Sequence, residues 1–376
     1  MLGFGSRACY NSSNTPVAPM KSNALTRCAL FTALAATILS ARATTLSEGD
    51  PAPKLTVSKW IQGEPVTAFQ PGTAYLVEFW ASWWTPSLEP LAHVNRIHQK
   101  FKDKGLVVIG QNVKDKDAAT AEQFAKRLAP IISYRVALDE GATNRLKGKM
   151  QENWLHAAEA GVPSAFVVDK KGTIIFIGHP DEVTDELIEQ VLAGTFDPKK
   201  RALDREAMAA KVEQWETHND AGKVAFKAKQ WDKAMSEVGE LEKIFPHRHV
   251  VTQCLRITVL MGENKFDEAG KLALQLGDEN KGDPFLQYRI ARTIANRSPT
   301  NTAILDKANL LMDRAIAQLK GPLPEFLHMQ ARLAFLQGKK DRAIQLETEA
   351  VDLADPLTKH QFAEALEGFK KGKPTQ

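Results

Sequence analysis

Side chains that can take part in chemistry gather between Glu78 and Ser87, a segment with one carboxyl group, three tryptophans and three hydroxyl groups. A serine hydroxyl becomes a nucleophile when a nearby base takes its proton, but no histidine lies in this segment. The indole ring of Trp84 has no nucleophilic lone pair, so it offers contact area rather than reactivity. We therefore expect Ser87 to cap a helix N-terminus rather than to attack a substrate.

Thiol chemistry depends on three cysteines, and their positions leave one for the mature chain. Cys9 and Cys28 lie in the first 43 residues, which have the composition of a signal peptide. Cys254 lies in an apolar helical stretch, residues 250–261, where a free cysteine is most often a buried structural group. The mature chain therefore cannot form an intramolecular disulfide, and its stability must come from packing.

Residues 1–43 contain no acidic residue, and an apolar block at residues 28–39 is too short to span a bilayer stably. The block is followed by Ala41-Arg42-Ala43, the small-x-small pattern that signal peptidases cut after. We therefore expect cleavage after Ala43 and a periplasmic or secreted protein without a stable membrane span. A retained N-terminal membrane anchor is the alternative, and translation from Met20 instead of Met1 is also open.

Charge argues against a nucleic-acid partner. The full chain has a formal net charge of +4, and the signal peptide carries four basic residues and no acid, which leaves the mature chain neutral. Binding a phosphate backbone needs a concentrated basic surface, whereas basic and acidic residues are interspersed here. His93 and His98 lie five residues apart on an expected helix and point in different directions, which predicts surface histidines. We expect neither a metal nor a cofactor.

Residues 44–197 alternate short β-rich runs with amphipathic helical stretches, a pattern typical of an α/β domain with a central sheet flanked by helices. A tight turn at residues 169–172 should join the last two strands as an antiparallel hairpin. The expected strands cover residues 75–80, 106–113, 134–138, 165–168 and 173–177, and the expected helices residues 87–102, 118–128 and 184–192.

From residue 198 onward strand signals stop, so an all-α domain is expected. Residues 198–219 resemble a charged connecting segment, residues 220–370 a stack of helix pairs, and residues 357–369 its closing helix. Alanines needed where two helices cross recur at intervals of 35, 39 and 35 residues, close to the roughly 34-residue tetratricopeptide (TPR) unit. These alanines are Ala234, Ala269, Ala308 and Ala343.

The segment from Glu78 to Ser87 resembles the active-site turn of the thioredoxin superfamily. Residues 49–53, Gly-Asp-Pro-Ala-Pro, are similar to the N-terminal entry of its exported redoxins, which are related to the alkyl-hydroperoxide-reductase (AhpC/TSA) type and the cytochrome-maturation thioredoxins. The Gly-Val-Pro sequence at residues 161–163 matches the family's cis-proline loop. Because the three motifs occur in the family's order, the resemblance implies a thioredoxin fold.

In that family, the positions of Trp84 and Ser87 hold the two cysteines of a C-x-x-C motif, and the helix N-terminus lowers the pKa of the first thiol. Neither replacement can cycle between thiol and disulfide, so dithiol exchange is excluded, and peroxide reduction lacks its thiolate. Glu78 matches the buried carboxylate that moves protons for the second cysteine. We expect a retained hydrogen-bonding acid; an acid with a raised pKa and an unknown task is the alternative.

The resemblance leaves a binding surface in place of a reaction centre. Trp83, Trp84, Val162 and Pro163 should form an apolar groove where family members receive an extended peptide. The alternative is that Trp84 folds down onto Pro163 and plugs the groove, because aromatic clusters usually serve packing.

Stacked helix pairs typically present a concave face that binds proteins or peptides, and Lys223 and Lys227 should lie on its inner helix. We therefore expect an exported interaction protein, in which a redox-inactive thioredoxin fold works with a TPR-like scaffold to bind a protein or peptide. A thiol-disulfide oxidoreductase or antioxidant redoxin is the alternative that resemblance alone suggests. A scaffold in which only the repeats bind is a second alternative.

Overall fold

The computed structural model describes residues 45–376, apart from residues 116–117, 142–147, 298–299 and 374–376. The predicted signal peptide and its cut after Ala43 therefore lie outside the described residues. In the part of the chain that is described, no helix combines the length and apolar character that a membrane crossing requires. The described residues belong to one compact unit.

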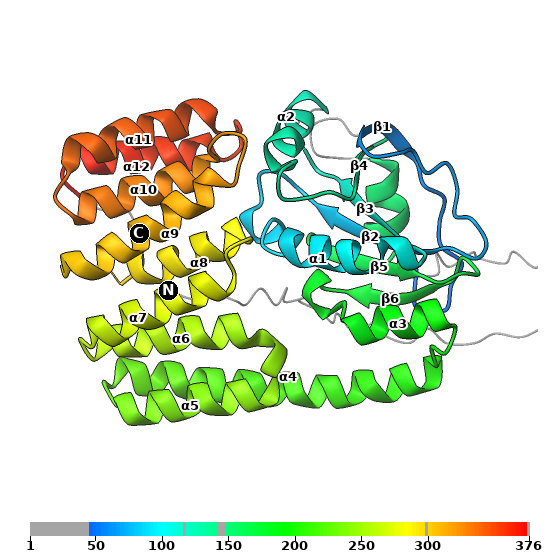
Figure 1. Ribbon diagram of the computed structural model, residues 1–376, viewed down its shortest axis with the longest axis horizontal. Coiled ribbons are helices and arrows are strands. Elements are labelled where there is room, and N and C mark those ends of the chain that lie inside the picture. The colour runs from blue at the N-terminus through cyan, green and yellow to red at the C-terminus, as the bar shows by residue number, and fades with distance from the viewer. Residues whose placement is uncertain (1–44, 116–117, 142–147, 298–299, 374–376) are drawn as a thin grey trace, which may run out of the picture. The chain divides into compact units, whose positions relative to one another are not determined.

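A six-stranded mixed sheet forms the centre of the N-terminal half, in the order β1-β4-β3-β2-β5-β6 (Figure 1). Strand β2 is parallel to β3, β3 is parallel to β4, and the other neighbours are antiparallel. This arrangement confirms the predicted α/β thioredoxin fold. The strands are β1 Val57–Gln62, β2 Ala74–Trp80, β3 Leu106–Asn112, β4 Arg135–Asp139, β5 Ser164–Val168 and β6 Ile174–Gly178.

Strand β2 lies in the middle of the sheet and is buried along its whole length. Because side chains alternate between the two faces of a strand, Leu76 and Trp80 pack in one apolar cluster and Val77 and Phe79 in another. The first cluster includes side chains of helices α1 Leu91–Phe101, α2 Ala118–Leu128 and α3 Asp185–Ala193. The second includes side chains of a π-helical turn at Gln151–His156.

Several local predictions are confirmed to within a residue or two. Helix α2 has the predicted bounds, and Thr184 accepts a hydrogen bond from the first turn of α3. Strands β5 and β6 form the predicted antiparallel hairpin, and its turn places Gly172 at φ +84°, a conformation that favours glycine. Strand β1 and the π-helical turn were not predicted.

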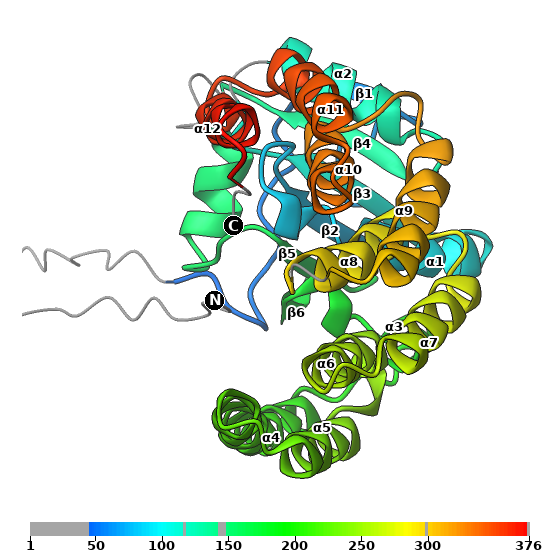
Figure 2. The same ribbon diagram turned by 90° about the vertical axis from the view of Figure 1, so that its left-hand side faces the viewer.

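The described residues after Pro198 contain helices and no strand, which confirms the all-α prediction. Helix α4 packs on α5, α6 on α7, α8 on α9 and α10 on α11, and α12 closes the series on α11 (Figure 2). The helices are α4 Pro198–Lys227, α5 Trp231–Ile244, α6 His249–Gly262, α7 Phe266–Glu279, α8 Pro284–Ala295, α9 Thr302–Ala317, α10 Pro324–Leu336, α11 Lys340–Leu353 and α12 Lys359–Lys370.

The four alanines of the repeat pattern are all buried, at the start of α5, α7 and α11 and within α9. Each therefore lies where a pair of helices packs closely, as the interval pattern predicts. Helix α4 continues without a break from Pro198 to Lys227, so it runs across the predicted change from connecting segment to repeat at residue 220.

Candidate functional site

The turn that follows β2 holds Trp84 and Ser87, the residues that the sequence predicts at the family's cysteine positions. A short 3-10 helix covers Thr85–Ser87, and α1 begins at Leu91. The Ser87 hydroxyl is buried. Its oxygen lies 2.8 Å from the carbonyl oxygens of Ala81 and Trp84, to which the hydroxyl donates, and it accepts a hydrogen bond from the Ala81 N–H at 3.1 Å. The prediction that Ser87 is a helix N-cap is wrong, because its side chain fastens the turn to its own start and the helix begins four residues later.

Asp115, after β3, clamps the same turn from a neighbouring loop. Its carboxylate accepts from the backbone N–H and hydroxyl of Ser82 at 3.2 and 2.7 Å, and from the Asn112 amide at 2.6 Å. Burial raises the pKa of Asp115 to about 6, although these hydrogen bonds act in the opposite direction. The Trp83 indole N–H donates to the Lys114 carbonyl at 2.7 Å. Sequence reasoning missed Asp115 because it lies far from the motif in the chain.

Trp84 is the large apolar side chain of the turn that faces outward, with 44% of its surface exposed. Its ring lies 6.1 Å from that of Trp83, which is half-buried. The Val162–Pro163 bond is cis, and both residues are half-buried. The next residue, Ser164, pairs with Phe79 on β2, so the loop and the turn leave adjacent strand ends. The structure therefore brings the predicted groove residues to neighbouring ends of the two inner strands β2 and β5.

Glu78 is fully buried on β2, and its Oε2 accepts a hydrogen bond from the Tyr134 hydroxyl at 3.0 Å. Its Oε1 has no hydrogen-bond partner among the described residues. Burial raises the pKa of Glu78 to about 8, and the Tyr134 bond only partly offsets this. The carboxyl group is therefore mainly protonated at neutral pH: it keeps the hydrogen bond of the first alternative and has the raised pKa of the second, whose unknown task stays a prediction.

The histidine prediction is wrong for His98, which is buried on the inner side of α1 with its ring 6.2 Å from the Tyr134 ring. Its side chain lies on the apolar face of α1 rather than on the solvent face. His93 is half-buried, with Nε2 2.9 Å from the Val183 carbonyl oxygen. In the described ranges, no group of three or more histidine, cysteine, aspartate or glutamate side chains is arranged to hold a metal ion.

Cys254 is a buried free thiol on α6, as the sequence predicts. Burial raises the pKa of the Cys254 thiol, so the reactive thiolate form is disfavoured. Lys223 and Lys227, the predicted inner-face lysines, lie near the end of α4. Lys223 forms an ion pair with Asp220 at 2.8 Å, and Lys227 is exposed.

A link between the site turn and the repeats was not predicted. Glu89, two residues after Ser87, forms ion pairs with Arg289 and Arg292 of α8, and the Arg292 pair measures 3.2 Å. The backbone N–H of Lys320 also donates to the Arg127 carbonyl at 3.1 Å. The segment that holds the family's reactive positions is therefore anchored to the helical half.

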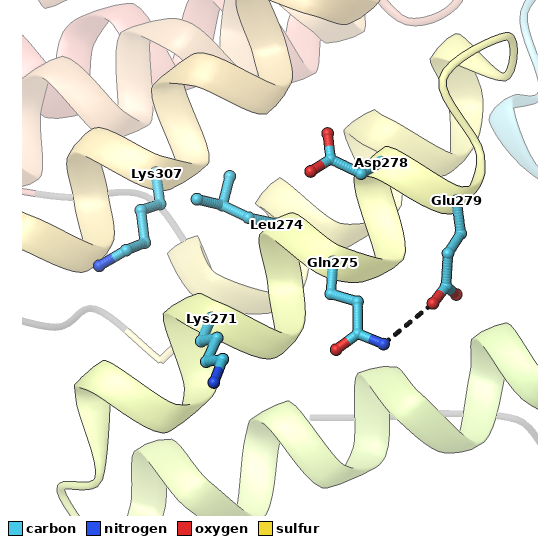
Figure 3. Close-up of a pocket in the computed structure, with 6 residues that line it drawn as sticks. All are labelled: Lys271, Leu274, Gln275, Asp278, Glu279 and Lys307. Atoms are coloured by element: carbon cyan, nitrogen blue, oxygen red, sulfur yellow. Dashed lines mark hydrogen bonds between the residues drawn. The ribbon is translucent and has the colours of Figure 1, made fainter.

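A hollow on the outer helices α7 and α9 lies apart from these residues in the sequence (Figure 3). Its lining carries both charge signs, and the Gln275 amide donates to Glu279 at 3.0 Å. It therefore indicates no single ligand chemistry. The lining residues are Lys271, Leu274, Gln275, Asp278, Glu279 and Lys307.

Comparison with known proteins gives the family. The Redoxin family model matches residues 47–192. Protein FixW of Rhizobium leguminosarum is 30% identical over 213 residues, which cover 53% of this chain and 91% of FixW. The chain belongs to the redoxin family. This redoxin is also 37% identical to the thiol:disulfide interchange protein HelX of Rhodobacter capsulatus over 131 residues, 34% of this chain and 65% of HelX.

Among solved structures, a thiol-disulfide isomerase from Corynebacterium glutamicum covers 39% of the redoxin chain, with 95% of its own chain matched. The sequence identity is 22% and the TM-score is 0.32.

Proposed function

We propose that this redoxin is an exported, redox-inactive protein that binds an extended segment of another protein. The binding surface is the predicted groove of Trp83, Trp84, Val162 and Pro163, and a TPR-like stack works with it. The observation that carries the proposal is the pair of replacements at the cysteine positions. Ser87 is buried and holds the turn together, whereas Trp84 faces outward.

The chemistry of these two side chains supports binding over electron transfer. Disulfide exchange needs a thiolate that attacks sulfur and a second thiol that resolves the mixed disulfide. A hydroxyl and an indole supply neither, and the thiol of Cys254 is buried. What remains at the turn is an exposed ring, and large aromatic side chains contribute strongly to protein interfaces.

The fixed frame around Trp84 also supports a binding role. Ser82 is bonded to Asp115, the Trp83 indole to Lys114, and Ser87 to the turn itself. A side chain presented on a rigid support loses less conformational entropy when it binds.

Binding to a permanently unfolded protein, such as reduced and carboxymethylated lactalbumin, tests this proposal in the mature chain. We expect Trp84→Ala to weaken binding by about 2 kcal/mol, or about thirtyfold in Kd, as for an interface hot spot. Leu310→Ala on α9 is the matched control, because Leu310 is 43% exposed, close to the 44% of Trp84. Equal affinities of the two variants for the unfolded protein would show that exposed apolar surface in general, and not the predicted groove, binds it.

The second candidate function is thiol-disulfide exchange, which the name of the HelX relative indicates for that protein. For this chain it would require a thiol other than the missing pair. Counting the thiols that react with a thiol reagent in the folded mature chain separates the two candidates. The binding proposal expects none, because Cys254 is buried and should react only after unfolding.

A further inference from the structure

Three arginines on α8 and α10 carry an excess of positive charge. Arg289 and Arg292 share the carboxylate of Glu89, so one negative charge serves two guanidinium groups. Arg332 of α10 donates to the neutral amide oxygen of Asn296 at 2.9 Å. No carboxylate of the described residues forms an ion pair with Arg332.

Arg332 reaches α8 one helical turn from Arg292, because its hydrogen-bond partner Asn296 follows Arg292 by four residues at the end of that helix. Burial lowers the pKa of Arg332 most and the positive charge of Arg292 lowers it further, although Tyr288 and Glu347 act in the opposite direction. Glu347 is itself bound to His328 at 2.9 Å, so it is not free to pair with an arginine. An arginine presents five donors in a planar fork, and Arg332 uses one of them in a hydrogen bond to the chain.

Other acidic groups near α8 do not balance this charge. The Asp283 carboxylate accepts the Leu286 N–H at 2.9 Å and so caps the start of the helix. Burial raises the pKa of Glu325 to about 7, which leaves much of that carboxyl group uncharged near neutral pH. The negative charge of Asp181 raises the pKa of Arg289 and is not among the charges that shift the pKa of Arg332.

The position of Arg292 is fixed by aromatic packing. Its guanidinium lies 5.3 Å from the centre of the Tyr288 ring, and that ring stacks on Phe326 of α10 at 4.9 Å. Its side chain is still 36% exposed, and Asn296, beside Arg332, is exposed. Arg292 is thus held in place and partly exposed, and Arg332 is half-buried beside the exposed Asn296.

We propose that Arg292 and Arg332 form a binding site for the carboxylate of an acidic side chain on a partner protein. The fork of an arginine matches the two oxygens of a carboxylate, and two forks from adjacent helix pairs can hold one acidic group from both sides. Glu89 is a carboxylate from this chain that α8 already holds in this way. The site gives a chemical class to the partner of the proposed function, on which it rests.

Titration calorimetry on the folded mature chain tests the site with two peptides that differ in charge alone. The probe is a Gly-Ser peptide with three consecutive glutamates, and the matched peptide carries three glutamines. We expect the glutamate peptide alone to bind, with an affinity that falls as salt increases. Arg332→Gln should reduce the affinity about tenfold or more, since a charge-assisted hydrogen bond is lost.

Arg342→Gln on α11 is the control, because Arg342 is exposed and donates to the neutral Gln345 at 2.9 Å, much as Arg332 does to Asn296. Asn296→Asp is an independent second variant, which should also weaken binding because it supplies Arg332 with a carboxylate from the same chain. This variant keeps the test decisive if Arg332→Gln fails to fold.

Unchanged peptide affinity in both variants, or no glutamate-dependent binding, would overturn the arginine site. Binding of a short oligonucleotide or inorganic phosphate without binding of the glutamate peptide would overturn it as well. Failure of the groove proposal gives a different result. In that case the peptide still binds through Arg332, whereas Trp84→Ala leaves the affinity for the unfolded protein unchanged.

Discussion

Replacing Glu78 with glutamine removes one titration whose size follows from its burial. In the folded chain the pKa of Glu78 is raised from 4.5 to about 8, mainly by burial. The unfolded chain therefore ionises Glu78 first, and folding has to keep the group protonated. The folded chain holds this proton more tightly than the unfolded chain, and this contribution to the free energy of unfolding is fully present below the unfolded pKa of 4.5. It is lost as the pH rises from there through the folded pKa of about 8.

Each unit of pH in this window changes the free energy of unfolding by about 1.4 kcal/mol per proton. Between pH 5 and pH 8 the natural chain should therefore lose roughly 4 kcal/mol that Glu78→Gln does not lose. Glutamine keeps an oxygen for the Tyr134 hydroxyl, so the local hydrogen bond survives the substitution. Other groups, such as Asp115 and Asp139, titrate in both proteins and cancel in the difference.

Urea unfolding followed by tryptophan fluorescence at pH 5, 6, 7 and 8 measures this difference. We expect the stability of Glu78→Gln relative to the natural chain to rise steadily across the series. Parallel curves for the two proteins would refute the reasoning, because they would mean that Glu78 has the same pKa in the folded and unfolded chains.

Three further substitutions test the clamp on the site turn, the helix packing of the repeats and the link between them. Asp115→Ala should cost about 1–3 kcal/mol, since it leaves buried donors unpaired, and should speed amide hydrogen exchange at Ser82; unchanged exchange would contradict the clamp. Ala308→Leu should cost about 1–3 kcal/mol in thermal unfolding through overpacking, whereas Ala209→Leu on the exposed part of α4 should not. Glu89→Gln should destabilise the chain in urea, because it leaves two arginines without their carboxylate; unchanged stability would show that the link is not energetically coupled.

Local patterns in the sequence predicted the elements that bury continuous apolar runs. Residues 74–80 are apolar apart from Glu78 and form the central strand, and the repeated alanines fall at buried helix crossings. Strand β1 was missed because it is an edge strand that pairs with β4 through two irregularities and is exposed at Ser58 and Lys59, so no apolar run marks it.

The residues of the site turn could be predicted from the sequence, whereas the contacts that hold the turn in place could not. The types of Trp84 and Ser87 already predict a turn without thiol chemistry, but the position of Ser87 depends on a 3-10 turn that delays the helix to Leu91. The contacts that fix the turn come from distant residues. Asp115 bonds Ser82 across 33 positions, and Arg289 meets Glu89 across 200 positions, separations at which helical and strand periodicity carry no information.

The central claim is that the fold binds without redox cycling, and an insulin-reduction assay with dithiothreitol tests it most directly. We predict that the natural mature chain reduces insulin no faster than dithiothreitol alone, and that the variant with both Trp84→Cys and Ser87→Cys gains measurable activity, because the turn then offers a dithiol beside the cis-proline loop. Reduction of insulin by the unmodified chain above the dithiothreitol background would contradict the claim.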